Sequence, residues 1–130
     1  MAVTNARNKE LALKKKIKKI YSLAHACSFD NTCPVKGVFA PAVDKWSLFC
    51  LYNLAYNKVL RFNKLKNYIP GISARMLSVT LKKLETAGLI ERSIFAEVPP
   101  RVEYKLTDFG NAFAAKLVDL NLWIWENRPQ

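Results

Sequence analysis

Hydrophobic residues near the start of the chain recur every three or four positions, which is the spacing of one face of an α-helix. The repeat predicts a helix over residues 5–26, with apolar positions Leu13, Ile17, Ile20, Tyr21 and Ala24. Lysines occupy most positions from 14 to 19, so this helix would have a narrow apolar face and a broad basic one. The pattern stops at residues 27–34, where small polar residues predict a loop.

Two helices are expected between this loop and residue 58. Pro34 suits the first turn of a helix, Cys33 would cap it, and Pro41 would end it early. Asp44 is then the expected N-cap of a longer helix. The residues expected on one apolar face of that helix are Trp46, Phe49, Cys50, Asn53 and Leu54.

A short strand and a short helix are expected next. The strand covers residues 59–62. Asn63 is the expected cap of a helix that runs through Ile69 and turns Leu65 and Tyr68 inward.

A second helix of this region follows the Pro70-Gly71 turn. Ser73 is its expected cap, and Gly88 would end it in a left-handed conformation. The inner stripe of the helix is predicted to be Leu77, Leu81 and Leu84.

Residues 89–96 and 102–106 alternate apolar and polar positions, as half-buried strands do. They predict a β-hairpin with Val98-Pro99-Pro100-Arg101 at its tip. The order helix, helix, two strands is that of a winged helix-turn-helix. The predicted fold class is therefore mainly α with a small β-hairpin (α+β), with extra N- and C-terminal helices.

The last predicted helix covers residues 108–126 and is capped by Thr107. It carries two apolar faces. The first consists of Phe109, Phe113, Leu117, Leu120 and Ile124, and the second of Val118, Leu122 and Trp125. A monomer of this size can bury one face, so the second indicates a subunit interface. The expected interface residues of a homodimer are Ile17, Ile20, Tyr21, Val118, Leu122 and Trp125.

Charge narrows the choice of partner. The net charge is +11, and residues 45–83 contain eight Lys or Arg and no acid. Such a concentration of one sign favours a polyanion, of which double-stranded DNA is the commonest. The pattern divides the chain into a basic arm (1–26), a loop (27–34), a winged helix-turn-helix DNA-binding core (35–107) and a C-terminal dimerisation helix and tail (108–130).

The candidate DNA contacts follow from the leucine stripe, because an inward stripe turns the opposite positions of the same helix outward. In a helix-turn-helix the start of the second helix enters the major groove. The candidates are Arg61, Asn63, Lys64, Lys66, Ser73, Ala74, Arg75, Ser78, Lys82 and Arg101. A helix with a solvated basic face, and a hairpin that is a rigid surface turn, remain open as the simpler interpretations.

Several motifs resemble one known family, the HxlR-type transcriptional regulators, over about residues 33–125. In chain order they are Cys33-Pro34-Val35, Lys45-Trp46-Ser47-Leu48, Arg61-Phe62-Asn63-Lys64-Leu65, Pro70-Gly71-Ile72-Ser73-Ala74-Arg75-Met76-Leu77, Leu81-Lys82-Lys83-Leu84-Glu85, Gly88-Leu89-Ile90-Glu91-Arg92 and Val98-Pro99-Pro100-Arg101-Val102-Glu103-Tyr104. The resemblance implies a bacterial winged helix-turn-helix regulator that dimerises through its terminal helices. It also implies a pseudo-palindromic site near a promoter. The chain departs from the family pattern in its longer, more basic N-terminal extension and at residues 39–44, where many relatives are glycine-rich.

The cysteines raise a second question. Some regulators of this type sense oxidants or electrophiles through the Cys of a Cys-Pro motif, which here is Cys33. A helix N-terminus would favour its thiolate, and Lys36 would add to this effect. An unreactive cap is the alternative. Cys27 is a candidate resolving partner, whereas Cys50 lies among apolar residues as a core thiol.

No metal or other cofactor is expected, since the spacing of His25, Cys27 and Cys33 fits no common metal site. The chain shows no phosphate loop or paired core carboxylates, so an enzyme is not expected. No secretory signal or membrane-crossing run appears, which favours the cytoplasm and no membrane partner. Two alternatives stay open: a nonspecific architectural DNA-binding protein, and a small-molecule-responsive regulator with a dimer-seam pocket lined by Trp46, Phe49, Trp123 and Trp125.

Overall fold

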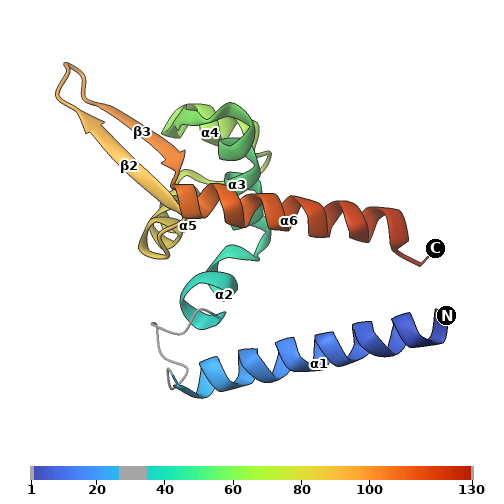
Figure 1. The fold of residues 1–130 in the computed structure, drawn as a ribbon. Helices are drawn as coiled ribbons and strands as arrows, with labels where there is room; N and C mark the ends of the chain where they lie inside the picture. The colour runs from blue at the N-terminus through green and yellow to red at the C-terminus, as the bar shows by residue number, and fades with distance from the viewer. Residues whose placement is uncertain (1, 27–34, 130) are drawn as a thin grey trace. The chain divides into compact units, whose positions relative to one another are not determined.

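A computed structural model describes residues 2–26 and 35–129 (Figure 1). The chain separates into two compact units, residues 1–39 and residues 40–130. The second unit contains the predicted helix-turn-helix and hairpin, whereas residues 35–39 of the predicted core (35–107) belong to the first unit.

The first unit contains helix α1 (Ala2–Ala26) and a short π-helix, η1 (Val35–Phe39). The helix predicted over residues 5–26 is confirmed and begins three residues earlier. Leu13, Ile17, Ile20 and Tyr21 of its apolar stripe are exposed, and Glu10 pairs with Lys14 at 3.2 Å one turn away. The predicted loop 27–34 and the predicted cap at Cys33 lie outside the described residues.

Helices α2 (Ala40–Ala42) and α3 (Lys45–Asn57) begin the second unit. The helical segment ends at Ala42, one residue after Pro41, in agreement with the predicted early end. The predicted cap of α3 is confirmed: the Ser47 amide donates to the Asp44 carboxylate at 3.0 Å.

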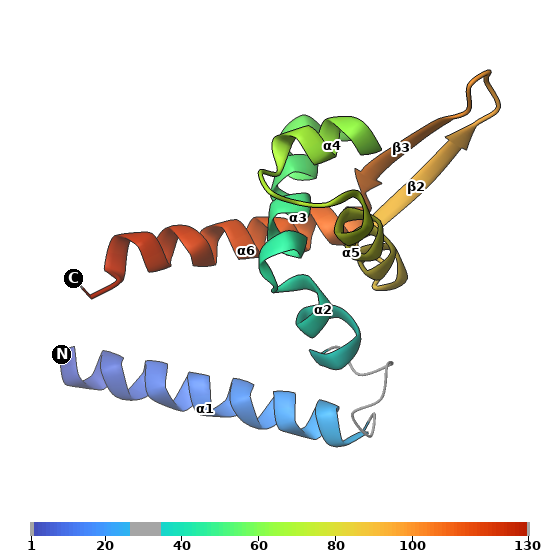
Figure 2. The same cartoon turned by 180° about the vertical axis from the view of Figure 1, so that it is seen from behind.

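The buried face of α3 differs from the predicted one. Ser47, Cys50, Leu51 and Leu54 are buried, whereas Phe49 is 40% exposed and Trp46 and Asn53 are half-buried. Ser47 tolerates burial because its hydroxyl bonds both the Pro41 carbonyl and Asp44. Helix α3 lies at the centre of this unit, in contact with α4, α5 and α6 (Figures 1 and 2).

Strand β1 (Val59–Arg61) and helix α4 (Phe62–Tyr68) follow. The predicted cap at Asn63 was wrong, since the N-cap is Arg61 and no side chain caps the helix. Leu65 is buried as predicted, but Tyr68 is exposed and Ile69 is buried in its place. Ile69 is the C-cap of α4 and its backbone is extended, so the direction of its side chain does not follow the helical repeat on which the prediction for Tyr68 was based.

Helix α5 (Ala74–Thr86) agrees with its prediction at both ends. The Met76 amide donates to the Ser73 hydroxyl at 3.0 Å, and Gly88 has φ +79°. The amide of Leu89 donates to the Leu84 carbonyl and that of Gly88 to Glu85, which is a Schellman motif. The predicted leucine stripe is buried, together with Thr80.

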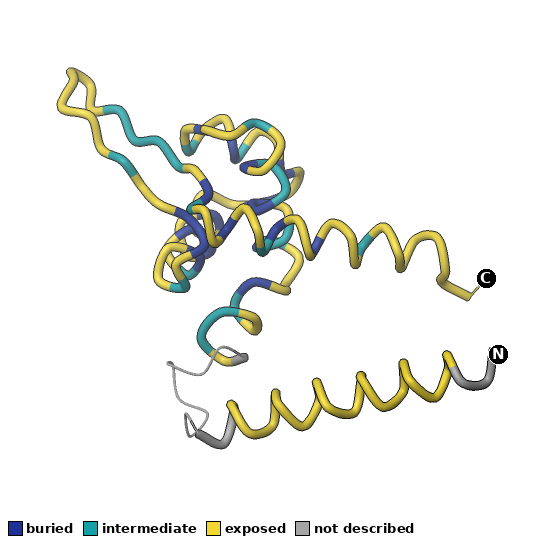
Figure 3. Tube along the Cα trace, viewed as in Figure 1, coloured by how far each residue is buried: buried dark blue, intermediate teal, exposed yellow. Residues whose placement is uncertain are grey.

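Strands β2 (Ile90–Phe95) and β3 (Arg101–Leu106) form the predicted hairpin. With β1 they make an antiparallel sheet in the order β1-β3-β2, in which Tyr104 lies opposite both Leu60 and Arg92. The far end of the hairpin extends away from the helices and is exposed (Figure 3). The predicted class, mainly α with a small sheet, is confirmed.

Helix α6 (Asp108–Asn127) is capped by Thr107 as predicted, but of the first predicted apolar face only Leu117 is buried. Gly110, Ala114 and Leu117 are buried, whereas Phe109, Leu120 and Ile124 are exposed. The reason is the close approach at Gly110, where a Cβ would overlap the backbone carbonyl of Leu89. The C-terminal half of α6 is exposed almost throughout (Figure 3).

Candidate nucleic-acid interface

Helix α5 presents a polar surface opposite its buried leucines. Ala74, Arg75, Ser78 and Lys82 are all exposed, and Ser73 caps the first turn. The turn over residues 69–73 joins α4 to α5, so the pair forms a helix-turn-helix. The side chains predicted to read DNA thus share one accessible face at the start of the second helix.

A cleft between α4 and the hairpin gathers four more of the predicted residues. Arg61, Asn63, Lys64 and Arg101 line it, together with Phe62, Pro100 and Val102, and its volume is about 460 Å³. Lys66 lies on α4, half-buried, and does not line this cleft. Three cations at one cleft beside the helix-turn-helix form a surface suited to phosphate.

A smaller cleft of about 170 Å³ contains a cationic residue that was not among the predicted DNA contacts. Arg92 on β2 lies there with Ser78 and Lys82, and Phe62, Leu81, Glu85 and Tyr104 complete the lining. Strand alternation could have placed Arg92 on an exposed face. Its approach to α5 depends on how the sheet packs on the helices, which the sequence pattern does not give.

Arg101 is held within the hairpin. Its guanidinium lies over the Phe95 ring, 4.1 Å from the centroid, and pairs with Glu97 at 3.4 Å and Glu103 at 3.3 Å. The side chain is 28% exposed. The predicted DNA contact at Arg101 therefore involves a cation that already has partners.

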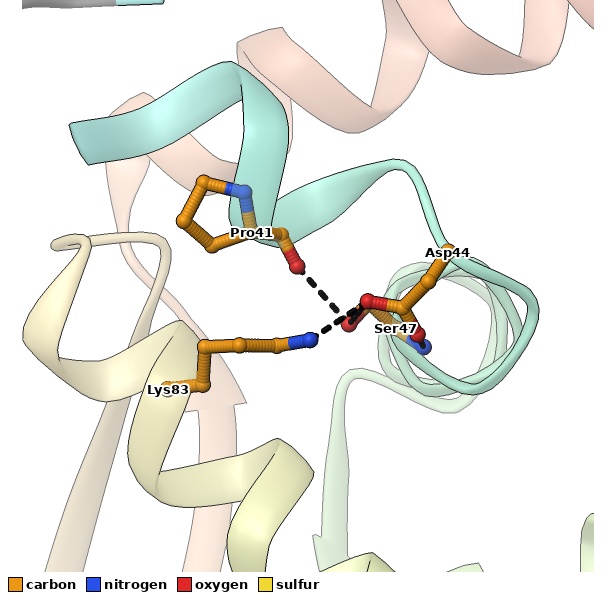
Figure 4. A network of polar contacts seen from close by, with 4 residues as sticks. All are labelled: Pro41, Asp44, Ser47 and Lys83. Atoms are coloured by element: carbon orange, nitrogen blue, oxygen red, sulfur yellow. Dashed lines mark hydrogen bonds and ion pairs between the residues drawn. The ribbon is translucent and has the colours of Figure 1, made fainter. Parts of the chain in front are cut away.

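A polar network fixes the start of α3 against α5 (Figure 4). Asp44 accepts from Ser47 and from Lys83, whose Nζ lies 2.5 Å from the carboxylate. Partial burial raises the pKa of Asp44, but the bonds from Lys83 and Ser47 outweigh it and hold that pKa below its ordinary value. The network ties the helix that carries the DNA candidates to the core.

Asp44→Ala is expected to cost about 1 kcal/mol of unfolding free energy at pH 7, because the cap and the pair are lost. A lowered carboxyl pKa stabilises the fold above the unfolded value of about 4, and this contribution disappears as the pH falls below it. Urea unfolding at pH 7 and pH 3 should show the gap to wild type narrowing at pH 3. Asp44→Asn, which keeps a cap, should lose less, and a gap unchanged at pH 3 would contradict the role of charge.

Burial raises the pKa of the Cys50 thiol to about 12, and the nearby Asp44 carboxylate adds to the effect. Cys50 is therefore a protonated, unreactive core thiol at neutral pH, in agreement with its predicted role. The predicted sensing residue Cys33 and its candidate partner Cys27 lie outside the described residues.

The predicted interface residues are all exposed. Ile17, Ile20 and Tyr21 lie on α1 in the first unit, and Val118, Leu122 and Trp125 lie on α6 in the second. The latter three border a cleft of about 580 Å³ between α3 and α6, with Lys45, Leu48, Phe49, Tyr52 and Asn121 as the other lining residues. Of the aromatic residues predicted to line a pocket, Phe49 and Trp125 border this cleft, whereas Trp46 and Trp123 do not.

Within residues 2–26 and 35–129, no group of three or more His, Cys, Asp or Glu side chains is arranged to hold a metal ion. Nor does any helix in these ranges have the length and apolar character to cross a membrane.

A helix-turn-helix with an accessible polar second helix, followed by a hairpin that borders a cleft lined by cations, defines a winged helix-turn-helix DNA-binding protein. Residues 42–130 match the family model described as HxlR-like helix-turn-helix. The chain belongs to this family of transcriptional regulators, as its motifs had indicated.

Known relatives agree with this assignment. The chain is similar to YybR of Bacillus subtilis, an uncharacterised HTH-type transcriptional regulator, at 33% identity over 85% of this chain and 83% of YybR. An uncharacterised HTH-type transcriptional regulator of Methanothermobacter thermautotrophicus is 42% identical over 70% of this chain and 69% of its own. These relatives are regulators, which supports a regulatory rather than an enzymatic role.

Solved structures show the same fold. The redox regulator HypR in its oxidised form has a TM-score of 0.64 and 33% identity, covering 75% of this chain and 100% of HypR. Diamide-treated YodB from B. subtilis has a TM-score of 0.62 and 28% identity, covering 71% of this chain and 90% of YodB.

Proposed function

We propose that this regulator binds a pseudo-palindromic promoter site as a homodimer, with one α5 helix reading each half-site. The observation that carries this proposal is the exposed face of α5, where Arg75 lies in the capped first turn. Arg75 suits bidentate contact with a guanine edge, and Ser78 and Lys82 suit phosphate contacts. Ser73 and Ala74 would approach the groove, while Arg61, Asn63, Lys64, Lys66 and Arg101 would position the DNA backbone.

The homodimer is supported by the apolar surface of α6. Val118, Leu122 and Trp125 are exposed in the single chain, and such a surface is costly in water. In this proposal residues 108–130 form the dimerisation helix and tail, residues 35–107 the DNA-binding core, and residues 1–26 a basic arm that supplies Ile17, Ile20 and Tyr21 to the interface. Because the proposed partner is chromosomal DNA, we expect the protein to lie in the cytoplasm.

Selection of bound sites from a random duplex pool at about 0.15 M salt tests this proposal. Enrichment of a palindrome with half-sites about one helical turn apart is the expected result. A pool that enriches no motif would contradict sequence reading. Sedimentation of the free chain at micromolar concentration tests the dimer, and a mass that stays at 14.8 kDa would contradict it.

A nonspecific architectural role is the second candidate, and helix α1 favours it. Lys14, Lys15, Lys16, Lys18 and Lys19 are exposed on α1, whose only acidic residue is Glu10. The two functions differ in the ratio of specific to competitor affinity at fixed salt. A ratio near one supports the architectural role and contradicts the sequence-reading regulator.

A thiol response through Cys33 is the regulatory part of the proposal. It is supported by similarity to HypR, described as a redox regulator, and to diamide-treated YodB. In this scheme, diamide or an electrophile changes the DNA affinity of wild type and leaves that of Cys33→Ser unchanged. Cys50 is an internal control, because its raised pKa should keep it unlabelled in the folded protein. A Cys33→Ser protein that still responds to diamide would refute the scheme.

Control by a small molecule is the alternative form of regulation, and the 580 Å³ cleft between α3 and α6 favours it. Its lining is mostly apolar, as in many ligand sites. Titration with the anionic, amphiphilic dye anilinonaphthalene sulfonate, at concentrations where the chain is dimeric, tests whether the cleft stays open. An open pocket should bind the dye in the wild-type protein and lose this binding in Trp125→Ala. A wild-type protein that does not bind the dye would contradict an open pocket.

A further inference from the structure

The end of the hairpin differs in charge from the rest of the DNA-facing surface. Residues 93–104 contain one base, Arg101, and two acids, Glu97 and Glu103. Both acids pair with the arginine, and the end of the hairpin, residues 93–104, brings a net negative charge to a surface otherwise rich in cations. A DNA phosphate that approached Arg101 would have to compete with carboxylates already in place.

The two carboxylates occupy different positions. Glu103 lies within β3, opposite Arg61 on β1 and Ser93 on β2, and its side chain is 25% exposed. Glu97 lies in the turn, where its amide donates to the Phe95 carbonyl at 2.8 Å, and its side chain is 52% exposed. Glu103 and the Phe95 ring can therefore orient the guanidinium from inside the sheet, while Glu97 covers it from the solvent side.

Arg101 also borders the cleft that contains Arg61, Asn63 and Lys64. A phosphate held there would lie near several donors, and the Glu97 carboxylate would be the neighbouring like charge. An exposed pair of this kind is weak in water, so phosphate can displace it at a modest cost. This cost would lower the binding affinity for every DNA sequence equally, because the phosphate backbone is the same for all sequences.

We propose that Glu97 is an attenuating residue of the interface: it holds Arg101 in an internal ion pair that a DNA phosphate must displace. This inference rests on the proposed DNA-binding function. Glu97 acts through Arg101 and is a positioning residue. It lowers affinity for specific and nonspecific duplex alike, while the base preference of α5 is unaffected.

The test measures the affinity of the full chain for an enriched site and for a random duplex, over a series of salt concentrations. Glu97→Gln is expected to tighten binding to both duplexes by about twofold to fivefold. The slope of log K against log salt should be the same in both proteins, because Arg101 neutralises the same phosphate once the DNA has displaced Glu97.

Two matched variants separate this mechanism from a simple change in net charge. Glu91→Gln removes an equivalent carboxylate on the same hairpin, which pairs with Lys105 at 2.9 Å, and is expected to change affinity by less than about twofold. The double variant Glu97→Gln/Arg101→Ala should bind no more tightly than Arg101→Ala. Melting curves of all variants check that the hairpin remains folded.

Three outcomes would overturn the inference: no gain from Glu97→Gln, an equal gain from Glu91→Gln, or a gain that persists without Arg101. Each leaves the proposed function intact if wild type still selects a palindrome. A wild-type chain that binds neither duplex would instead refute the proposed function, and this inference with it.

Discussion

Arg75→Ala is expected to cost about 1–3 kcal/mol of binding free energy on the cognate site and to relax base preference at one position of each half-site. The reason is the place of Arg75 on α5, exposed and one residue after the first helical position. A guanidinium there can donate two bonds to a guanine edge, and alanine can donate none. Repeating the duplex selection with the variant would measure the change position by position.

Lys82→Gln is the matched control for Arg75→Ala. It lies two turns further along the same exposed face and is proposed to contact phosphate. It should weaken all sequences alike and lower the salt slope by about 0.9, with base preference kept. If Arg75→Ala behaved in the same way, Arg75 would be a phosphate contact and the proposed base reader would have to be sought elsewhere.

Gly110→Ala is expected to destabilise the fold by about 3 kcal/mol or more, although the same change in an open helix would stabilise it by about 1 kcal/mol. The added Cβ would meet the backbone carbonyl of Leu89, which a rotamer change cannot relieve. Leu89 joins α5 to β2, so the variant should separate α6 from the hairpin base. Urea unfolding measures the effect.

Asn111→Ala is the neighbouring control for Gly110→Ala. Asn111 is exposed on α6, and its replacement should change the unfolding free energy by no more than about 0.5 kcal/mol. A Gly110→Ala protein as stable as wild type would show that the helix can move away from Leu89 without loss.

The helix-turn-helix was predictable because its signals are local. Ser73 and Gly88 bound α5 through hydrogen bonds and a left-handed residue within a few positions of each helix end. The leucine stripe then fixes which side of α5 is exposed. For these reasons the place of Ala74, Arg75, Ser78 and Lys82 on one accessible face followed from periodicity alone.

The buried faces of α3 and α6 were predicted less well, because large apolar residues were assumed to point inward. In α3 the interior position belongs to Ser47, whose hydroxyl is satisfied by Pro41 and Asp44. In α6 it belongs to Gly110 and Ala114, whose small size lets the helix approach Leu89. This close approach depends on the position of the Leu89 backbone, which is far from α6 in the sequence. The composition of α6 alone therefore does not predict it.

Sequence periodicity, caps and charge were thus enough for the order of elements, the exposed face of α5 and the basic character of the surface. Tertiary packing decided the rest: the clefts at α4 and β2, the exposure of the distal half of α6, and the ion pairs that hold Arg101. The physical reason is the sequence distance over which each interaction acts. Caps and periodicity act over a few residues, whereas a cleft or a pairing such as Arg61 opposite Glu103 requires segments that are far apart in the chain.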